Sequence, residues 1–366
     1  MIENTSFLPN WASPPGETIS DFLEDQGLTD SDLARQIDLS ADQVRSLLRG
    51  AYPLTQNLAY QLADSLGGSS SFWLAREVQY RACLERVAQS ELWVKTLPTK
   101  DMVNFGWLPR TKSLSEKVAA CLEYFDVASV AEWFENYEGA HRLAAFRQSP
   151  SFDSNEAAIL AWLRKGEIEA SQVNCNVWNE NEFLAELSSI KKLTREKVPE
   201  HFIPILRQAC AKHGVALVIA QAPNGCRASG ATKFVSQEKA LILMSERYLS
   251  DDHFWFTFFH EAAHLLLHSD KRLFIEGNEK RHTNEEAEAD SFSQDILIPP
   301  EHQQEFRDLE VNAKAVIRFA RKIGVSPGIV AGQMQHAGSC PRQMLNKLKV
   351  RYRKGQLASA ANLDSL

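Results

Sequence analysis

The stretch FWFTFFHEAAHLLLH at residues 254–268 is the most informative part of the sequence. Its apolar residues recur on almost every side of a helix, so the helix is predicted to be buried. His260 and His264 are four residues apart, so on a helix both imidazoles project from one face and can hold one metal ion. Glu261 stands beside them, placed to take a proton from water and pass it to a leaving amine. The stretch therefore predicts a catalytic metal site.

The two histidines could instead be core residues whose ring nitrogens are satisfied by hydrogen bonds. A third ligand would distinguish a metal site from this alternative. The acidic run at residues 285–290 follows the helix and contains Glu286. Two histidines and a glutamate with an open fourth position form a known catalytic zinc arrangement. Asp290 lies one helical turn beyond Glu286, where it can hold a ligand histidine by its other ring nitrogen. An acidic run alone is usually a solvated helix face, but both motifs together predict one bound Zn²⁺, with His260, His264 and Glu286 as ligands.

The composition is that of a globular protein with enough chain for two or three domains. The chain has 366 residues, 44% hydrophobic and 24% charged, and a net charge of −7. No apolar run approaches the ~18–20 residues of a membrane helix, and the first residues lack the features of a signal peptide. The cysteines are scattered without a C-x-x-C pair, as expected for reduced thiols: Cys83, Cys121, Cys175, Cys210, Cys226 and Cys340. These features predict a cytoplasmic protein with no membrane partner.

Short helical patterns follow a proline-rich start. A tight turn joins the second pattern to the third, which is the layout of a helix-turn-helix whose second helix enters the major groove. The patterns cover residues 18–26, 29–37, 40–49 and 55–66. Residues 14–85 resemble the Cro/C1 type of helix-turn-helix, most closely the HigA-like antitoxin branch in which PGE leads in and FWL follows. Both triplets are present here, at 15–17 and 72–74.

By that resemblance, residues 40–49 would read DNA, with four exposed candidates: Gln43, Arg45, Ser46 and Arg49. The charge opposes this role, because residues 1–66 carry three basic and ten acidic residues, and phosphate contacts supply most DNA affinity. Asp42 even stands at the start of the reading helix. Weak DNA binding aided by dimerisation and reuse of the motif for protein contact are the two alternatives. A homodimer is expected only from the resemblance.

The pattern changes from helices to a small sheet near residue 198. Residues 86–197 show helical spacing without a chemical motif, and a further helix is predicted at 199–213. Strands are predicted at 215–220, 227–235 and 239–244. A helix, a small sheet and then the H-E-x-x-H helix is the layout of a minimal zinc-peptidase lobe. Residues 228–234 are the predicted sheet edge that holds an extended substrate, because their small side chains let a peptide backbone approach.

Three runs together resemble the ImmA/IrrE family of metallopeptidases over residues 198–300. They are FHEAAHLLLH at 259–268, EAEADSF at 286–292 and the closing Ile-Pro within 296–299. The resemblance implies a gluzincin-like zinc endopeptidase, with Glu261 as the base. It also implies a protein substrate, namely a helix-turn-helix repressor or antitoxin in a stress, mobile-element or toxin–antitoxin system. Some family members fuse a helix-turn-helix to the peptidase.

The residue that stabilises the oxyanion is not identified by any motif. The candidates are His268, His282, Arg281 and Tyr248, and His268 has the alternative of simply extending the buried helix face. The basic cluster within 342–354 can contact nucleic acid, dock on the acidic N-terminal segment, or form a solvated helix face.

The predicted fold is mostly α with a small sheet, an α+β arrangement. It has an N-terminal five-helix bundle at 14–85, a helical part at 86–197 and a peptidase lobe at 198–300, then C-terminal helices at 301–354 and a disordered tail at 355–366. The alternative function is a non-enzymatic DNA-binding regulator whose zinc site is structural.

Overall fold

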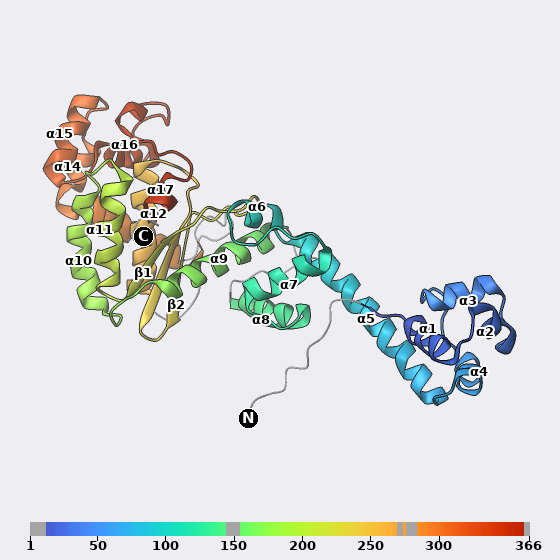
Figure 1. The fold of residues 1–366 in the computed structure, drawn as a ribbon. Coiled ribbons are helices and arrows are strands. Elements are labelled where there is room, and N and C mark those ends of the chain that lie inside the picture. Colours follow the sequence, from blue (N-terminus) through green and yellow to red (C-terminus); the bar gives the residue numbers. More distant parts are fainter. Residues whose placement is uncertain (1–11, 144–153, 269–273, 276–283, 362–366) are drawn as a thin grey trace. The chain divides into compact units, whose positions relative to one another are not determined.

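The fold comes from a computed structural model that describes residues 12–143, 154–268, 274–275 and 284–361. The chain forms two compact units (Figure 1), each of which is considered by itself. Unit 1 contains the chain up to Lys95 together with Leu108–Trp133, and unit 2 contains Thr96–Trp107 and the chain from Phe134 onward.

Unit 1 is a bundle of helices with well-defined caps. Thr29 and Ser40 each form a capping box at the start of a short helix. Gly16 is needed where the first helix meets the third, because a Cβ atom there would collide with the backbone of Leu48. The helices are α1 (Pro15–Gln26), α2 (Asp30–Gln36), α3 (Ala41–Leu48), α4 (Gln56–Leu66), α5 (Ser70–Thr96) and α7 (Leu114–Phe125).

The first four helices of unit 1 confirm the four helical segments predicted from the sequence. Their core is apolar and includes Leu33, Val44, Leu62 and Trp73. Residue 85, the predicted end of the helix-turn-helix domain, lies inside α5, which continues to Thr96. Helix α8 (Val130–Leu143) follows α7.

Unit 2 contains a four-stranded mixed sheet. In space the strands follow the order β1-β3-β2-β4, with β1 and β3 parallel and the other pairs antiparallel. Their bounds are β1 (Val215–Ile219), β2 (Gly230–Ser236), β3 (Lys239–Met244) and β4 (Phe274–Ile275). The first three were predicted within three residues at each end, whereas β4 was not predicted.

Helices cover both faces of this sheet, because side chains alternate along each strand. Leu217 and Ile242 face the cluster built from α10, α11 and α12. Val218 and Leu243 face the other side, where they pack with Trp162 of α9. The covering helices are α9 (Ser154–Gln172), α10 (Glu180–Leu193), α11 (Pro199–Ala211) and α12 (Asp251–Leu267). The predicted mostly α fold with a small sheet is therefore confirmed.

The remaining helices of unit 2 are shorter, and one of them corrects a prediction. Residues 356–361 were predicted to be disordered, but they form α17, because Leu357, Ala360 and Ala361 are buried and α17 packs on α11. The others are α6 (Thr99–Asn104), α13 (Asn284–Leu297), α14 (Gln303–Arg307), α15 (Ala313–Ile323) and α16 (Pro327–His336), with 3₁₀ turns at Pro300–His302 and Asn346–Leu348.

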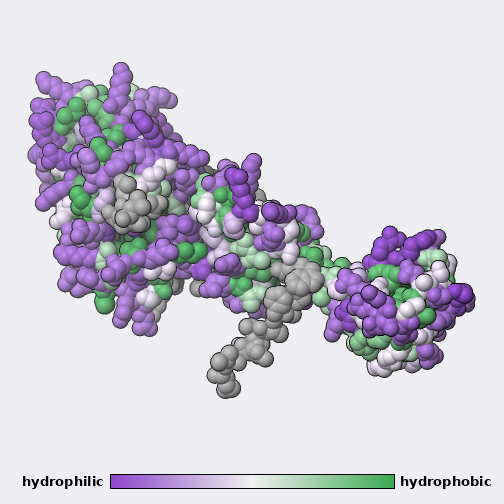
Figure 2. Space-filling view, in the orientation of Figure 1, coloured by the Kyte–Doolittle hydropathy of each residue, from purple (hydrophilic) through white to green (hydrophobic). Residues whose placement is uncertain are grey.

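The predicted substrate edge is also corrected. Strand β2 is not at the edge of the sheet, because β4 pairs with it at Ala231 and Thr232 on the side away from β3. A two-residue strand from a distant segment has too little pattern to be recognised in sequence. Hydrophilic side chains cover most of the face in Figure 2, and none of the described helices is long and apolar enough to span a membrane.

Candidate metal centre

Helix α12 is held in the centre of unit 2 by its apolar side chains. Trp255, Phe258 and Phe259 are fully buried, as predicted from the apolar pattern. Helix α13 lies against α12. His260 and His264 are also buried, at 2% exposure each, so they sit in surroundings where polar groups need partners.

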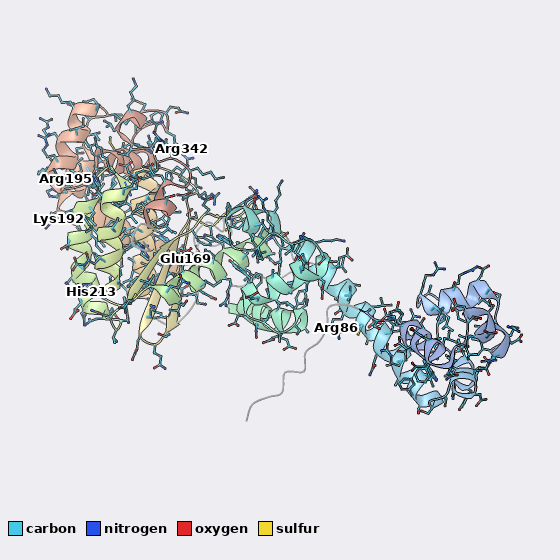
Figure 3. All side chains as sticks on the ribbon, in the orientation of Figure 1. Arg86, Glu169, Lys192, Arg195, His213 and Arg342 are labelled. Carbon is cyan, nitrogen blue, oxygen red and sulfur yellow. The ribbon has the colours of Figure 1, made fainter. Side chains whose placement is uncertain are left out.

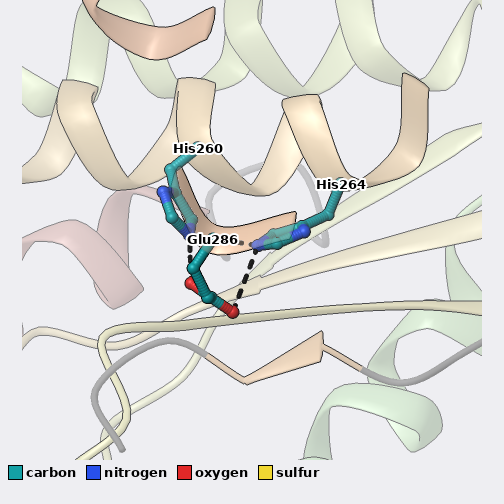
Figure 4. Close-up of side chains that lie close together, drawn as sticks. All are labelled: His260, His264 and Glu286. Atoms are coloured by element: carbon teal, nitrogen blue, oxygen red, sulfur yellow. Dashed lines mark hydrogen bonds and ion pairs between the residues drawn. The ribbon is translucent and has the colours of Figure 1, made fainter. Parts of the chain in front are cut away.

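The partner of both histidines is Glu286 of α13 (Figure 4). The Nε2 atoms of His260 and His264 are 3.1 Å apart. Glu286 Oε2 lies 3.2 Å from Nε2 of His260, and its Oε1 lies 3.7 Å from Nε2 of His264. Among the described residues, these three form the one group of histidine, cysteine and acidic side chains close enough to hold a metal ion. The structure thus brings together all three predicted ligands.

The spacing of these three donors suits zinc. Ligand atoms about 2.0–2.2 Å from a tetrahedral ion lie roughly 3.3–3.6 Å from one another. The two Nε2 atoms are 3.1 Å apart, and the nearest Glu286 oxygen is 3.2 Å from one of them (Oε2) and 3.7 Å from the other (Oε1), all near that range. Two imidazole nitrogens and a carboxylate oxygen are also a donor set that zinc accepts while keeping a position open. The residues present therefore fit one zinc ion.

The second ring nitrogen of each histidine, Nδ1, contacts another side chain. Nδ1 of His260 lies 2.9 Å from Oδ1 of Asp290, the contact predicted from sequence. Nδ1 of His264 lies 3.2 Å from Nδ1 of His268, and Nε2 of His268 lies 3.0 Å from Oε2 of Glu288. If each Nδ1 atom of the two buried histidines donates, both Nε2 lone pairs are left for the metal.

The ionisation of the donors follows from these contacts. Burial raises the pKa of Glu286, but hydrogen bonds from His260 and His264, which the rings can donate from Nε2 until a metal takes that position, outweigh it and hold the pKa at about 2. Burial lowers the pKa of His264, and the nearby charges of His260 and His268 lower it further, against the opposing effect of Glu286. An ionised carboxylate and a neutral imidazole are the forms in which these side chains bind metals.

Glu261 is fully buried beside the donors, against strand β2. The hydroxyl of Thr232 donates to its Oε2 at 2.5 Å and also reaches its backbone oxygen at 3.2 Å. A Cβ atom on Gly230 would collide with Oε1 of Glu261, so a glycine lets β2 pass close to the carboxylate. Neither contact was predicted, because no local pattern links residues 29 and more positions apart.

The other predicted residues lie elsewhere. His268 contacts His264 on the side of the ring away from the three donors. Tyr248 stacks on His253 near the start of α12, with 4.4 Å between ring centroids. His282 and Arg281 fall outside the described residues.

The residues predicted to contact DNA are on or next to α3 in unit 1, and most are engaged locally. Gln43 caps its own helix by accepting from the backbone of Ser40. Arg45 pairs with Asp42, and Nε of Arg49 donates to the backbone oxygen of Arg45. Ser46 is partly buried.

One family comparison bears on this centre. Residues 210–334 match the model of the IrrE N-terminal-like domain, a peptidase family. The matched segment runs from the end of α11 to α16 and contains all three donors and Glu261. It supports the resemblance inferred from the sequence for this part of the chain and does not extend to the helices of unit 1. No curated protein in the comparison matches the chain.

Proposed function

We propose that this protein is a zinc-dependent endopeptidase of the ImmA/IrrE kind, whose site is formed by α12, α13 and β2. The observation that carries this proposal is the convergence of His260, His264 and Glu286 on one point beside the buried carboxylate of Glu261. The match of residues 210–334 to a peptidase family supports it. A structural zinc site would need no such glutamate.

In this proposal His260, His264 and Glu286 hold the metal, and Glu261 moves the proton. A bound zinc ion supplies Lewis acidity, which activates water near neutral pH and polarises a peptide carbonyl. Glu261 accepts the proton that the attacking water loses and delivers it to the nitrogen of the leaving amine. The Thr232 hydroxyl fixes Oε2 of Glu261 during this exchange, and Gly230 leaves space next to Oε1.

The proposed substrate is a helix-turn-helix repressor or antitoxin, and the proposed role is regulatory. The resemblance of residues 14–85 to a helix-turn-helix supports this, because the same chain would then carry both the recognition module and the protease. Cytoplasmic location, homodimer formation and DNA binding by α3 belong to the same proposal.

The test is a paired comparison of the wild type with Glu261→Gln. Each protein is assayed for bound zinc by elemental analysis, and for cleavage of a co-expressed helix-turn-helix repressor or antitoxin. We expect one zinc per chain in both proteins and cleavage by the wild type alone, with a loss of about 10²–10⁴-fold in rate. Zinc in neither protein would show that the histidines are core residues.

The second candidate function is a DNA-binding regulator whose zinc only stabilises the fold. The helical bundle of unit 1 and its capped α3 favour it. It predicts zinc in both proteins, no cleavage of any partner, and DNA binding that survives Glu261→Gln.

A further inference from the structure

A cluster of cations surrounds an aromatic pair at the start of α12, outside the metal centre. Tyr248 is 44% exposed, and its ring stacks on His253 at an interplanar angle of 20°. The guanidinium of Arg247 lies 5.0 Å from the centroid of the same Tyr248 ring. The aromatic pair is therefore exposed and in cation–π contact with Arg247.

Further cations reach this pair from the C-terminal segment. Partial burial lowers the pKa of His253, and the charges of Lys349, Arg351 and Arg342 lower it further, against the opposing effect of Asp252. Residue 351 is also tied to the start of α12 by a backbone bridge to Ser250. The charges of these basic side chains therefore act on His253, and the bridge brings the backbone of residue 351 to the start of the same helix.

The buried acids nearby do not neutralise the three arginines. Asp252 pairs with Lys349 at 2.6 Å, and both side chains are more than nine-tenths buried. Arg247, Arg342 and Arg351 are exposed, and no carboxylate in the described part of the chain forms an ion pair with any of them. In a chain of net charge −7, this leaves a local surplus of positive charge.

The cluster shares a helix face with the metal centre. His253 precedes His260 by seven residues, nearly two full helical turns, so both project from one side of α12. Seven residues of helix span about 10 Å, which is roughly three residues of extended peptide. A small hollow beside the aromatic pair, lined by Ser229, Tyr248, His253 and Thr257 among others, holds about 20 Å³, room for one water molecule rather than a side chain. A substrate side chain is too large for this hollow, so the exposed cations would have to recognise it.

We propose that Arg247, Arg342 and Arg351, with the Tyr248–His253 pair, bind an acidic segment of the peptide substrate, about three residues from the bond that is cut. This inference rests on the proposed peptidase function and adds a substrate class to it. A nucleic acid is the less suitable occupant, because three exposed arginines offer few phosphate contacts to a ligand that gains most of its affinity from them.

The test uses the full-length, zinc-loaded protein with Glu261→Gln, so that bound peptide stays intact. Two fluorescein-labelled peptides, identical except for several glutamates in one and glutamines in the other, are compared by fluorescence anisotropy at low ionic strength. We expect the glutamate peptide to bind about tenfold more tightly, and the difference to shrink as salt is added. Replacing Arg247, Arg342 and Arg351 together by Gln should abolish the preference.

The matched control is Arg195→Gln, an exposed arginine also in unit 2, which Figure 3 labels well apart from Arg342. This variant should keep the preference. Equal binding of the two peptides overturns the proposal, and so does tighter binding of a single-stranded oligonucleotide through the same arginines.

The cleavage arm separates this inference from the proposed function. If the wild type and the triple variant each cut both peptides equally, the peptidase proposal is supported and the proposed preference for acidic peptides is contradicted. If neither peptide is cut but the preference for the glutamate peptide depends on the arginines, binding of acidic peptides is supported and the peptidase proposal is contradicted.

Discussion

Helices α12 and α3 both carry polar side chains that the sequence singles out, but the two helices use them differently. On α12, His260 and His264 point away from their own helix and meet Glu286 from α13. On α3, Arg45 pairs with Asp42 three residues away, on the same helix. The polar groups of α12 are therefore satisfied by distant segments, and those of α3 mostly by their immediate neighbours.

The two kinds of contact differ in what they cost. Local contacts such as caps and pairs three residues apart form in any helix and stabilise it slightly. Buried donors that converge from two helices cost free energy to assemble, because each must lose its water. Such an arrangement needs a compensating ligand or reaction, so the side chains of α12 support a function more strongly than those of α3.

The largest effect should come from breaking the convergence on α12. Replacing Glu286 by Ala removes one of the three donors, so the protein should no longer retain zinc through dialysis. Elemental analysis after gel filtration measures this. The matched control is Glu285→Gln, the neighbouring acid on α13, which should keep one zinc per chain. Full zinc retention by Glu286→Ala would exclude Glu286 as a ligand.

A second effect concerns the start of the same helix. Asp251 is 1% exposed and accepts from the hydroxyl of Ser326 and the backbone of Val350. Burial, partly offset by these hydrogen bonds, raises its pKa from 3.8 to about 6. Because the folded state then holds the proton more tightly than the unfolded state, this group's contribution to the free energy of unfolding should fall by about 3 kcal/mol over its whole titration, about 2 kcal/mol of it between pH 4 and 6.

Urea unfolding of the wild type and Asp251→Asn across this pH range, followed by tryptophan fluorescence, measures that contribution. The stability advantage of the wild type over the variant should shrink as pH rises, since the variant lacks the titrating group. Carboxylates distant from Asp251 titrate equally in both proteins and cancel in the difference. A difference that stays constant with pH would contradict the pKa shift.

A smaller effect should come from the residues behind the donors. His268→Ala removes the ring against Nδ1 of His264, and loss of such a contact weakens metal binding about 10–100-fold. Competition with a chromophoric chelator measures the zinc affinity. Glu288→Gln should weaken it less, because Glu288 is 61% exposed and acts through His268. If His268→Ala leaves the zinc affinity unchanged but slows cleavage, His268 would instead stabilise the oxyanion, which is the role considered for it from the sequence.

The smallest effect tests α3. If this helix contacts DNA, Asp42→Asn should free Arg45 and strengthen binding to duplex DNA a few-fold at low salt. The same change in an Arg45→Ala background should have no effect. Fluorescence anisotropy of a labelled duplex measures both. If Asp42→Asn strengthens DNA binding equally with and without Arg45, the effect of Asp42 does not act through its ion pair with Arg45.

Much of the fold followed from local patterns. The helices of unit 1 were predictable because Thr29 and Ser40 mark helix starts that depend only on neighbouring residues. The three longer strands were predictable from short apolar runs. Strand β4 and helix α17 were missed because each is only a few residues long, and a short segment is ordered by what it packs against.

Local spacing was enough to predict the three candidate ligands, because the four-residue spacing of His260 and His264 fixes their common helix face and the acidic run supplies a third donor. The partners that complete the site depend on how the segments of unit 2 pack together. The contact of Thr232 with Glu261 and that of Glu288 with His268 join residues 29 and 20 positions apart in the chain. The physical reason is that local patterns constrain backbone geometry, whereas side-chain partners are set by how the elements pack.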